Sequence, residues 1–502
     1  MKYVLGIDLG TSSLKGLLID EYGNIITSKS SSYDLITLQS GYSEQNPQDW
    51  CDAFDEVVKG IVSEGIDCED IVAISFSGQM HSLVTLDKDD KVIRNAILWN
   101  DTRVSKECDY IMSNFGDELL KITKNRALEG FTLPKLLWMR ENEKDNFEKI
   151  NTFLLPKDYL AFYTTKVKQM EYSDAAGTLM LDIKNKIWSK EIIDYFKLDS
   201  KIFPKLQNSY DLVGRIDEAV ALKVGLSKNT LIYSGAADNA CAAIGAGIID
   251  DSMAMASIGT SGVFLSYEKD YTKEYNGDLH YFNHANGAYY SMGVTLSAGN
   301  SLNWFVKEFY DNKNFNEILK NIKNIPLGSD GLMFVPYLMG ERSPHFDSKV
   351  RASFIGIDQH HTKEYFLRSV LEGITFSLKD CQEIMEKVKA VKFDKIVSVG
   401  GAAKNKEWLQ MQADIFNAKI VTLKTEEGPA LGAAIIAAVG ACLFNSFEDC
   451  IAKFVKYQDA IIPSLENVKK YRELYEIYQT IYPSIKDTTH SLQKYYENNK
   501  TH

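Results

Sequence analysis

Cysteine is scarce in this sequence, and metal-binding patterns are lacking. The 502 residues include seven cysteines, and no two of them form a CxxC pair. An odd number of widely spaced cysteines excludes a disulfide framework and favours the reducing cytoplasm as the place of action. The eight histidines form no HExxH motif, so nothing in the sequence supports a zinc centre.

Basic charge and long apolar runs are also lacking. The chain has 56 Lys and Arg against 68 Asp and Glu, a formal net charge of −12, so neither nucleic acid nor an anionic membrane is an expected partner. The longest apolar run, Ala430 to Phe444, is shorter than the roughly 20 residues that span a bilayer, and it predicts a buried helix. Asp8 interrupts the apolar start of the chain, so no signal peptide is expected. Small molecules and copies of the chain itself are the expected partners.

Two segments of the chain share one pattern. An apolar strand, the GTSS turn at 10–13 and a second strand come first, and the same order returns around the GTSG turn at 259–262. The two turns are 249 residues apart, almost half of the chain, so an internal duplication of one fold explains the spacing. We therefore expect an N-terminal domain over 1–249, a second domain over 250–444 and a C-terminal helical extension over 445–502.

The order of the apolar segments predicts the fold class. Helical patterns alternate with short β-branched runs such as Ile71 to Phe76. One helix is predicted to begin at Asn46 and Pro47, a cap followed by proline at the first helical position. This alternation is typical of an α/β fold.

Neither of the two common phosphate-binding sequences is present. The chain has no GK dipeptide, hence no Walker loop, and no GxGxxG between a strand and a helix. The two GTS turns offer backbone amides and hydroxyls to phosphate oxygens, although each is also compatible with an ordinary hairpin. Asp8, at the end of a buried strand, is costly to desolvate unless it meets a cation or hydrogen-bond donors. It is a candidate ligand for Mg²⁺, through water.

Two further glycine-rich segments lie in the second half. In 398–405 (SVGGAAKN) a strand ends in Gly400 and Gly401 and leads to Asn405, and these groups are candidates for contact with a nucleotide. The segment 428–434 (GPALGAA) begins a helix whose small residues allow close packing, so a structural role is favoured for it.

Asp238 is the strongest candidate for a catalytic group. It follows an apolar strand and precedes an alanine-rich helix predicted over 239–249. An aspartate at this place is often only a cap, but the helix dipole also keeps it ionised, and a carboxylate of ordinary pKa is adequate to accept a proton from a sugar hydroxyl. GQMH at 78–81 and WNDTR at 99–103 suit a polyol pocket but also ordinary loops, and a histidine such as His81 is usually structural.

Taken together, these motifs resemble those of the FGGY family of carbohydrate kinases over nearly the whole chain, to about residue 440. The matching segments are GIDLGTSSLK at 6–15, GYSEQNPQDW at 41–50, ILWNDTR at 97–103, FTLPKLLW at 131–138, LLPKDYL at 154–160, YSDAAGT at 172–178, IGTSG at 258–262, PYLMGERSPH at 336–345, VGGAAKN at 399–405 and GPALGAA at 428–434. The resemblance implies the actin-like ATPase (ribonuclease H-like) fold. Two duplicated domains, each with a five-stranded mixed sheet flanked by helices, would enclose a central cleft.

The resemblance also implies ATP and Mg²⁺ as cofactors and assigns site residues. Asp238 would be the general base, and Asp8 a second catalytic carboxylate that serves Mg²⁺ or phosphate. The implied substrate-binding residues are Met80, His81, Asp238, Asn239, Trp99 and Arg103. The implied ATP-binding residues are Thr11, Ser12, Gly259, Thr260, Gly299, Asn303, Gly400, Gly401 and Asn405. Relatives are often dimers, so the resemblance is compatible with a homodimer.

GQMH at 78–81 and AADNA at 236–240 resemble the sugar-site motifs of family members that phosphorylate D-xylulose. The expected function is therefore ATP-dependent phosphorylation of D-xylulose to D-xylulose 5-phosphate. Two alternatives stay open at this point. One is a kinase of the same family for another sugar or polyol, such as gluconate, ribulose or a pentitol, and the other is an actin-like ATPase without a sugar substrate.

Overall fold

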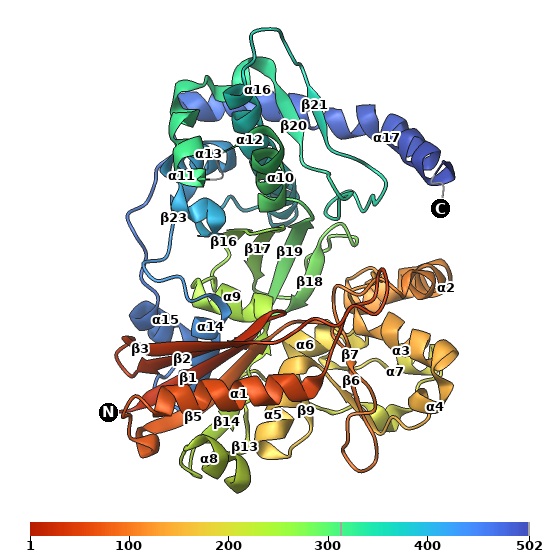
Figure 1. The fold of residues 1–502 in the computed structure, drawn as a ribbon, viewed down its shortest axis with the longest axis vertical. Coiled ribbons are helices and arrows are strands. Elements are labelled where there is room, and N and C mark those ends of the chain that lie inside the picture. The colour runs from red at the N-terminus through yellow and green to blue at the C-terminus, as the bar shows by residue number, and fades with distance from the viewer. Residues whose placement is uncertain (312–313, 500–502) are drawn as a thin grey trace.

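Two β-sheets, one in each half of the chain, form the frame of the molecule (Figure 1). The computed structural model describes residues 1–311 and 314–499. The first sheet has seven strands in the order β13-β14-β5-β1-β2-β3, with β15 paired to the end of β5; they are β1 (Tyr3–Leu9), β2 (Ser13–Asp20), β3 (Ile25–Ser32), β5 (Ile71–Gly78), β13 (Leu212–Arg215), β14 (Leu231–Tyr233) and β15 (Ala236–Ala237). The second sheet has six strands in the order β18-β19-β17-β16-β22-β23; they are β16 (Met253–Ile258), β17 (Gly262–Glu268), β18 (His280–Asn283), β19 (Tyr289–Thr295), β22 (Lys395–Gly400) and β23 (Lys419–Val421).

The two sheets repeat one topology. In each, three antiparallel strands (β3-β2-β1 and β19-β17-β16) continue into two parallel strands (β5-β14 and β22-β23). This correspondence confirms the predicted duplication and the actin-like ATPase fold. The expected number of five strands in each sheet is wrong: the first sheet also contains β13, paired with β14, and the short β15, paired with the end of β5, and the second also contains β18, paired with β19.

Helices flank both sheets, and short strand pairs join the loops. The first half contains α1 (Pro47–Val62), α2 (Ser105–Thr123), α3 (Thr132–Asn142), α4 (Lys144–Phe147), α5 (Pro156–Thr165), α6 (Tyr172–Ala176), α7 (Lys190–Tyr195), α8 (Glu218–Val224) and α9 (Asp238–Gly245). The second half and the C-terminal segment contain α10 (Gly299–Phe309), α11 (Phe315–Ile318), α12 (Lys363–Lys389), α13 (Lys406–Phe416), α14 (Gly428–Gly440), α15 (Phe447–Phe454), α16 (Leu465–Tyr478) and α17 (Ile481–Asn498). The strand pairs are β4 (Glu44–Gln45) with β7 (Ala96–Ile97), β6 (Val84–Leu86) with β8 (Thr152–Leu154), β9 (Gln169–Glu171) with β12 (Lys205–Gln207), β10 (Leu181–Asp182) with β11 (Ile187–Trp188) and β20 (Met333–Val335) with β21 (Ser353–Ile355).

Local signals explain where two of these helices begin and end. The side chain of Asn46 accepts a hydrogen bond from the Gln48 amide at 3.2 Å, and Pro47 is the first residue of α1, as predicted. Helix α9 ends before the predicted limit at residue 249. Gly247, with φ +74°, has the left-handed conformation that terminates helices.

Helix α14 returns from the second half and packs against β1, β5 and α9 of the first half (Figure 1). A Cβ at Gly432 would lie 1.9 Å from the Cys241 carbonyl oxygen, and a Cβ at Gly6 would lie 2.0 Å from that of Ala430. Only glycine permits such approaches. The packing confirms both the buried helix predicted for the apolar run and the structural role favoured for 428–434. The first sheet is thus covered by a helix that follows the predicted boundary at 250.

The C-terminal extension is helical: its first helix, α15, packs against α14 and lies beside β3 of the first half, whereas α16 closes over the second half (Figure 1). Tyr471, Tyr475 and Tyr478 of α16 are buried, and their rings pack against Phe376 of α12. In the part of the chain that the structure describes, every helix is too short or too polar to cross a membrane.

Candidate active site

Two carboxylates meet at the carboxyl ends of three parallel strands. β5 lies between β1 and β15, and the register places Leu9 beside Gly78 and Gly78 beside Ala237. Asp8 and Asp238, the chain neighbours of the first and last of these residues, therefore lie at the same edge of the sheet. Ligands of open α/β sheets bind at this edge.

Burial and charge perturb both carboxylates. Withdrawal from water raises the pKa of Asp238 to about 7, and the negative charge of Asp8 adds to the rise, whereas hydrogen bonds from Asn239 lower it. Burial also raises the pKa of Asp8, against the lowering by Ser77 and Lys15 on the neighbouring strands. Desolvation therefore raises the pKa of Asp238 above the ordinary value that would already be adequate for a base. A carboxyl group with a pKa near 7 suits proton transfer at neutral pH.

Asp238 is the first residue of α9 rather than its cap. Ala237 has the N-cap place. The Asp238 carboxylate accepts hydrogen bonds from the amide of Asn239 at 2.7 Å and from Nδ2 of the same residue at 2.9 Å. A capping side chain binds the second or third amide further on instead. The local geometry thus favours a functional carboxylate over a helix cap.

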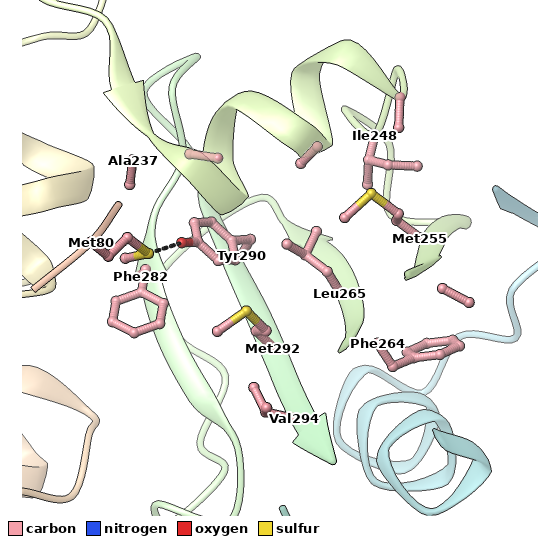
Figure 2. Packing of buried hydrophobic residues seen from close by; sticks show 14 of the residues in the cluster. Met80, Ala237, Ile248, Met255, Phe264, Leu265, Phe282, Tyr290, Met292 and Val294 are labelled. Atoms are coloured by element: carbon pink, nitrogen blue, oxygen red, sulfur yellow. Dashed lines mark hydrogen bonds between the residues drawn. The ribbon is translucent and has the colours of Figure 1, made fainter. Parts of the chain in front are cut away.

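Met80 and His81 turn the chain just after β5, beside Asn239. Nδ2 of Asn239 lies 3.6 Å from Sδ of Met80, and Oη of Tyr290 lies 3.9 Å from the same sulfur (Figure 2). His81 has a left-handed backbone with φ 68°, which is uncommon for this residue type. Nδ1 of His81 lies 2.6 Å from the carbonyl oxygen of Gly177. Burial lowers the pKa of the ring to about 3, so the imidazole is neutral and donates a hydrogen bond from Nδ1.

Trp99 and Arg103, the other two residues predicted for the sugar site, differ in their surroundings. Trp99 is 42% exposed, and its Nε1 donates a hydrogen bond to Oγ1 of Thr11 at 3.0 Å, which links it to the first phosphate turn. The guanidinium of Arg103 is buried and pairs with Asp101 at 2.6 Å and with Glu44 at 2.7 Å. The structure therefore brings Trp99 to the predicted turn and places Arg103 in an internal ion-pair cluster.

The first GTS turn is anchored on both halves of the molecule. Nε2 of Gln45 donates a hydrogen bond to the carbonyl oxygen of Thr11 at 2.7 Å, and Ser12 is exposed at the tip. Lys15, just after the turn, forms an ion pair at 2.5 Å with Glu427, the residue before α14. The turn thus has a fixed backbone, with Ser12 exposed at its tip.

The second GTS turn holds the N-terminus of α10. The carbonyl oxygens of Gly259 and Thr260 accept hydrogen bonds from the amides of Gly299 at 2.8 Å and Asn300 at 3.0 Å. A Cβ at Gly299 would lie 2.4 Å from the Gly259 oxygen, so the approach requires glycine. The N-terminus of a helix favours anionic groups. Gly400, with φ +85°, packs in a similar way against the end of β16.

A cavity of about 290 Å³ opens between these segments. Its lining residues are Ile258, Gly259, Gly299, Leu302, Asn303, Phe315, Leu319, Gly401, Ala402, Lys404, Asn405 and Trp408. The structure therefore brings together five of the residues predicted to contact ATP, namely Gly259, Gly299, Asn303, Gly401 and Asn405. The apolar part of the wall suits a purine ring. No sequence motif identifies this apolar wall, because its residues come from distant segments that only the fold brings together.

Tyr290 is a second feature of the site that sequence reasoning missed. It belongs to β19 of the second half, yet its hydroxyl reaches Met80 of the first half (Figure 2). Burial raises the pKa of Tyr290 well above its ordinary value, and the nearby charge of Asp238 adds to the rise. No local pattern distinguishes this tyrosine from the 26 others in the chain, which has 27 in all. Gln45, in contrast, lies within the motif GYSEQNPQDW at 41–50, so the sequence alone could have identified it.

The carboxylate pair is suited to a divalent cation. Asp8 and Asp238 place two carboxyl groups at one sheet edge, and Lys15 on the neighbouring strand is ion-paired with Glu427. Carboxylates in a partly desolvated cleft favour a cation, and Mg²⁺ prefers carboxylate and water ligands. The donor set therefore fits Mg²⁺ at Asp8.

The repeated sheet topology and the two GTS turns define a protein of the actin-like ATPase fold. Residues 3–245 match the N-terminal domain of the FGGY family of carbohydrate kinases, and residues 254–441 match its C-terminal domain. The chain belongs to the FGGY family of carbohydrate kinases.

Its relatives include several xylulose kinases. The chain is 50% identical to the xylulose kinase of Lactococcus lactis subsp. lactis over 498 residues, 99% of both chains. It is 49% identical to that of Bacillus subtilis over 501 residues, 99% of this chain and 100% of the relative. Among solved structures, ligand-bound xylulose kinase from Lactobacillus acidophilus has a TM-score of 0.93 at 28% identity, over 98% of this chain and 100% of that chain. Gluconate kinase from Lactobacillus acidophilus has a TM-score of 0.92 at 28% identity, over 96% and 98%.

Proposed function

We propose that this chain transfers the γ-phosphoryl group of ATP to the 5-hydroxyl of D-xylulose and releases D-xylulose 5-phosphate and ADP. The choice of D-xylulose as substrate is supported by the identity of 49–50% to xylulose kinases over nearly the whole length of both chains. The solved structures do not separate the sugars, because a xylulose kinase and a gluconate kinase share this fold almost equally. Gluconate and the other sugars and polyols are therefore competitors to be tested.

Asp238 is proposed as the general base. Its carboxylate accepts the proton of the 5-hydroxyl while that oxygen attacks the γ-phosphorus in line and the bond to the β-phosphate oxygen breaks. Asn239, Met80 and His81 are proposed to hold the sugar beside it. Their mutual contacts and the pKa of Asp238, raised to about 7, support this arrangement.

The second half is proposed to bind ATP. The cavity beside α10 would take the adenine against its apolar wall, with Gly299, Asn303, Gly401 and Asn405 around it. The turns at Thr11–Ser12 and Gly259–Thr260 would bind the phosphates through amides and hydroxyls. Asp8 would hold Mg²⁺ through water, and the ion, when bound with ATP, neutralises charge on the phosphates.

A coupled ADP assay with pentuloses, hexuloses, polyols and gluconate tests the substrate. We expect D-xylulose to have the highest kcat/KM and ATP consumption to depend on added sugar. Activity on another member but not on D-xylulose would overturn the substrate and keep the family. ATP hydrolysis that does not depend on any sugar would favour an actin-like ATPase.

Asp238→Asn tests the base. We expect kcat to fall by about 10²- to 10⁴-fold, the range that a general base contributes. Asp217→Asn is the matched control, because Asp217 caps α8 by accepting from Ala219 and Val220, and asparagine caps equally well. An Asp238→Asn enzyme with nearly normal turnover would show that Asp238 serves only the helix.

We propose domains over 1–249, 250–444 and 445–502, action in the cytoplasm, and a homodimer. The seven cysteines, all unpaired, are consistent with a reducing compartment. On α17, Leu492 and Tyr495 are 63% and 70% exposed, and such apolar side chains favour a partner surface. Sedimentation of the full chain would give its oligomeric state.

A further inference from the structure

Four charged side chains are completely buried beneath the strand ends that carry Asp8 and Asp238. Lys157, at the start of α5, lies 2.6 Å from Asp158, 3.1 Å from Asp174 and 3.5 Å from Glu171, and all four side chains have 0% exposure. One ammonium group therefore faces three carboxylates. The mechanism proposed above uses none of these residues.

Glu171 connects this cluster to the backbone before Asp238. Its carboxylate accepts hydrogen bonds from the amides of Ser173 and Asp174, both at 2.8 Å, and from the hydroxyl of Ser173 at 2.5 Å. The same Ser173 oxygen accepts a hydrogen bond from the amide of Ala237 at 2.9 Å. A continuous series of hydrogen bonds therefore runs from Glu171 to the amide of Ala237, the residue immediately before Asp238.

The cluster also packs against the end of β5. A Cβ at Gly78 would lie 2.9 Å from Cβ of Lys157, so the end of β5 rests directly on the start of α5. Gly78 pairs with Ala237 on one side and with Leu9 on the other. Lys157 therefore supports the strand that separates the two site carboxylates.

Such a cluster is not a favourable source of stability. Charges lose their hydration on burial, and replacement by apolar side chains often stabilises a protein. The environment is strong enough to raise the pKa of Asp158 to about 7 and that of Asp174 well above its ordinary value, chiefly through burial. The arrangement instead fixes the positions and orientations of its groups, since each hydrogen bond holds one atom relative to another.

We propose that Ser173 and Glu171, supported by Lys157, are positioning residues that hold the Ala237 amide and thereby aim the Asp238 carboxylate at the sugar hydroxyl. This inference rests on the proposed function, because it presupposes that Asp238 is the base. Neither residue touches the substrate in this scheme.

Ser173→Ala and Glu171→Gln test the proposal in the full chain. Misplacement of a reacting group by about 1 Å can cost about 10²-fold, so we expect kcat to fall by roughly 10- to 100-fold in each variant. The KM values for sugar and ATP should stay within about threefold, because the binding contacts are intact. The kcat of the double variant should be no lower than that of the more impaired single variant, since both substitutions interrupt one series of hydrogen bonds.

Ser369→Ala is the matched control. Ser369 is 1% exposed, and its hydroxyl donates to the Phe366 carbonyl oxygen at 2.8 Å, within α12. A comparable loss of kcat in Ser369→Ala, or losses that multiply in the double variant, would overturn positioning in favour of general destabilisation. Wild-type kcat in a folded Ser173→Ala enzyme would overturn it as well. If Ser173→Ala does not fold, Glu171→Gln alone is judged by the same criteria. A wild-type chain without sugar-dependent ADP release would instead overturn the proposed function.

Discussion

At the scale of single residues, the raised pKa of Asp238 has a consequence for the pH dependence of catalysis. The base works when deprotonated, so kcat/KM for the sugar should fall as the pH drops through about 7. His81 stays neutral throughout this range, because its pKa is about 3. Asp8→Asn removes the like charge, so the midpoint of its residual activity should move to lower pH. A midpoint that stays in place or rises, against Asp217→Asn as control, would contradict this account.

The Asp238 carboxylate should also destabilise the folded protein. Its folded-state pKa lies above the ordinary value of 3.8, so the folded protein binds the proton more tightly, and the penalty of ionisation grows as the pH rises from about 4 to about 7. Asp238→Asn should therefore unfold at a temperature about 2 °C or more above the wild type at about pH 8, with a smaller difference at about pH 5. Thermal scans of both proteins at both pH values measure this, and an Asp238→Asn melting temperature below that of the wild type at about pH 8 would contradict it.

Many of the candidate site residues were readable from the sequence because they lie in short local patterns. Local patterns indicate an accessible backbone at the GTS turns and at the double glycine 400–401. They indicate a charged group at the aspartate between a strand and a helix. Tyr290 and the apolar wall at Trp408 were not readable, since they reach the site only through long-range packing. The motif that contains Arg103 does not reveal that this side chain pairs with Glu44 and Asp101.

At the scale of elements, glycine governs how closely the second turn approaches α10. Gly299→Ala would force its Cβ to within 2.4 Å of the Gly259 carbonyl oxygen. The helix end would shift away from the turn, and the KM for ATP should rise by about 10-fold, equivalent to about 1.4 kcal/mol, with little change for the sugar. Steady-state kinetics with each substrate varied would measure both constants.

Gly60→Ala is the control for this substitution. Gly60 lies within α1, and the nearest atom to its added Cβ would be Cγ of Lys29 at 3.5 Å, an ordinary contact. Alanine should stabilise the helix by about 0.5–1 kcal/mol and leave both KM values unchanged. Equal effects of the two substitutions on the KM for ATP would show that the contact at Gly259 is unimportant.

Elements were predictable where periodicity and caps agree, as at Asn46 and Pro47 of α1 and in the paired hairpins. The extra edge strands β13 and β18 were missed because their pairing depends on where the chain returns, not on a local pattern. The early end of α9 depends on the left-handed conformation of a single glycine, Gly247. An alanine- and glycine-rich sequence gives no sign of which glycine adopts it.

At the scale of the whole molecule, the two halves are joined on two sides. Helix α14 crosses to the first sheet, and the residues after α2 reach the second sheet. The buried side chain of Asn125 donates from Nδ2 to the Tyr281 carbonyl oxygen at 2.7 Å and accepts from the Tyr281 amide at 3.2 Å. Next to it, Nζ of Lys124 lies 2.8 Å from Glu274. The contacts of Asn125 and Lys124 therefore hold the two halves together independently of α14.

Asn125→Ala should weaken this connection. The amide and carbonyl of Tyr281 would lose their partners in a buried place, which costs about 1–3 kcal/mol. We expect a lower melting temperature and a sugar KM raised about fivefold, because binding energy of about 1 kcal/mol would then be needed to align the halves. Asn114→Ala is the control, since the side chain of that exposed asparagine donates to the Tyr110 carbonyl oxygen at 2.8 Å, within α2. Calorimetry and sugar kinetics would measure both effects, and an Asn125→Ala enzyme that matches Asn114→Ala would show that the halves are aligned by α14 alone.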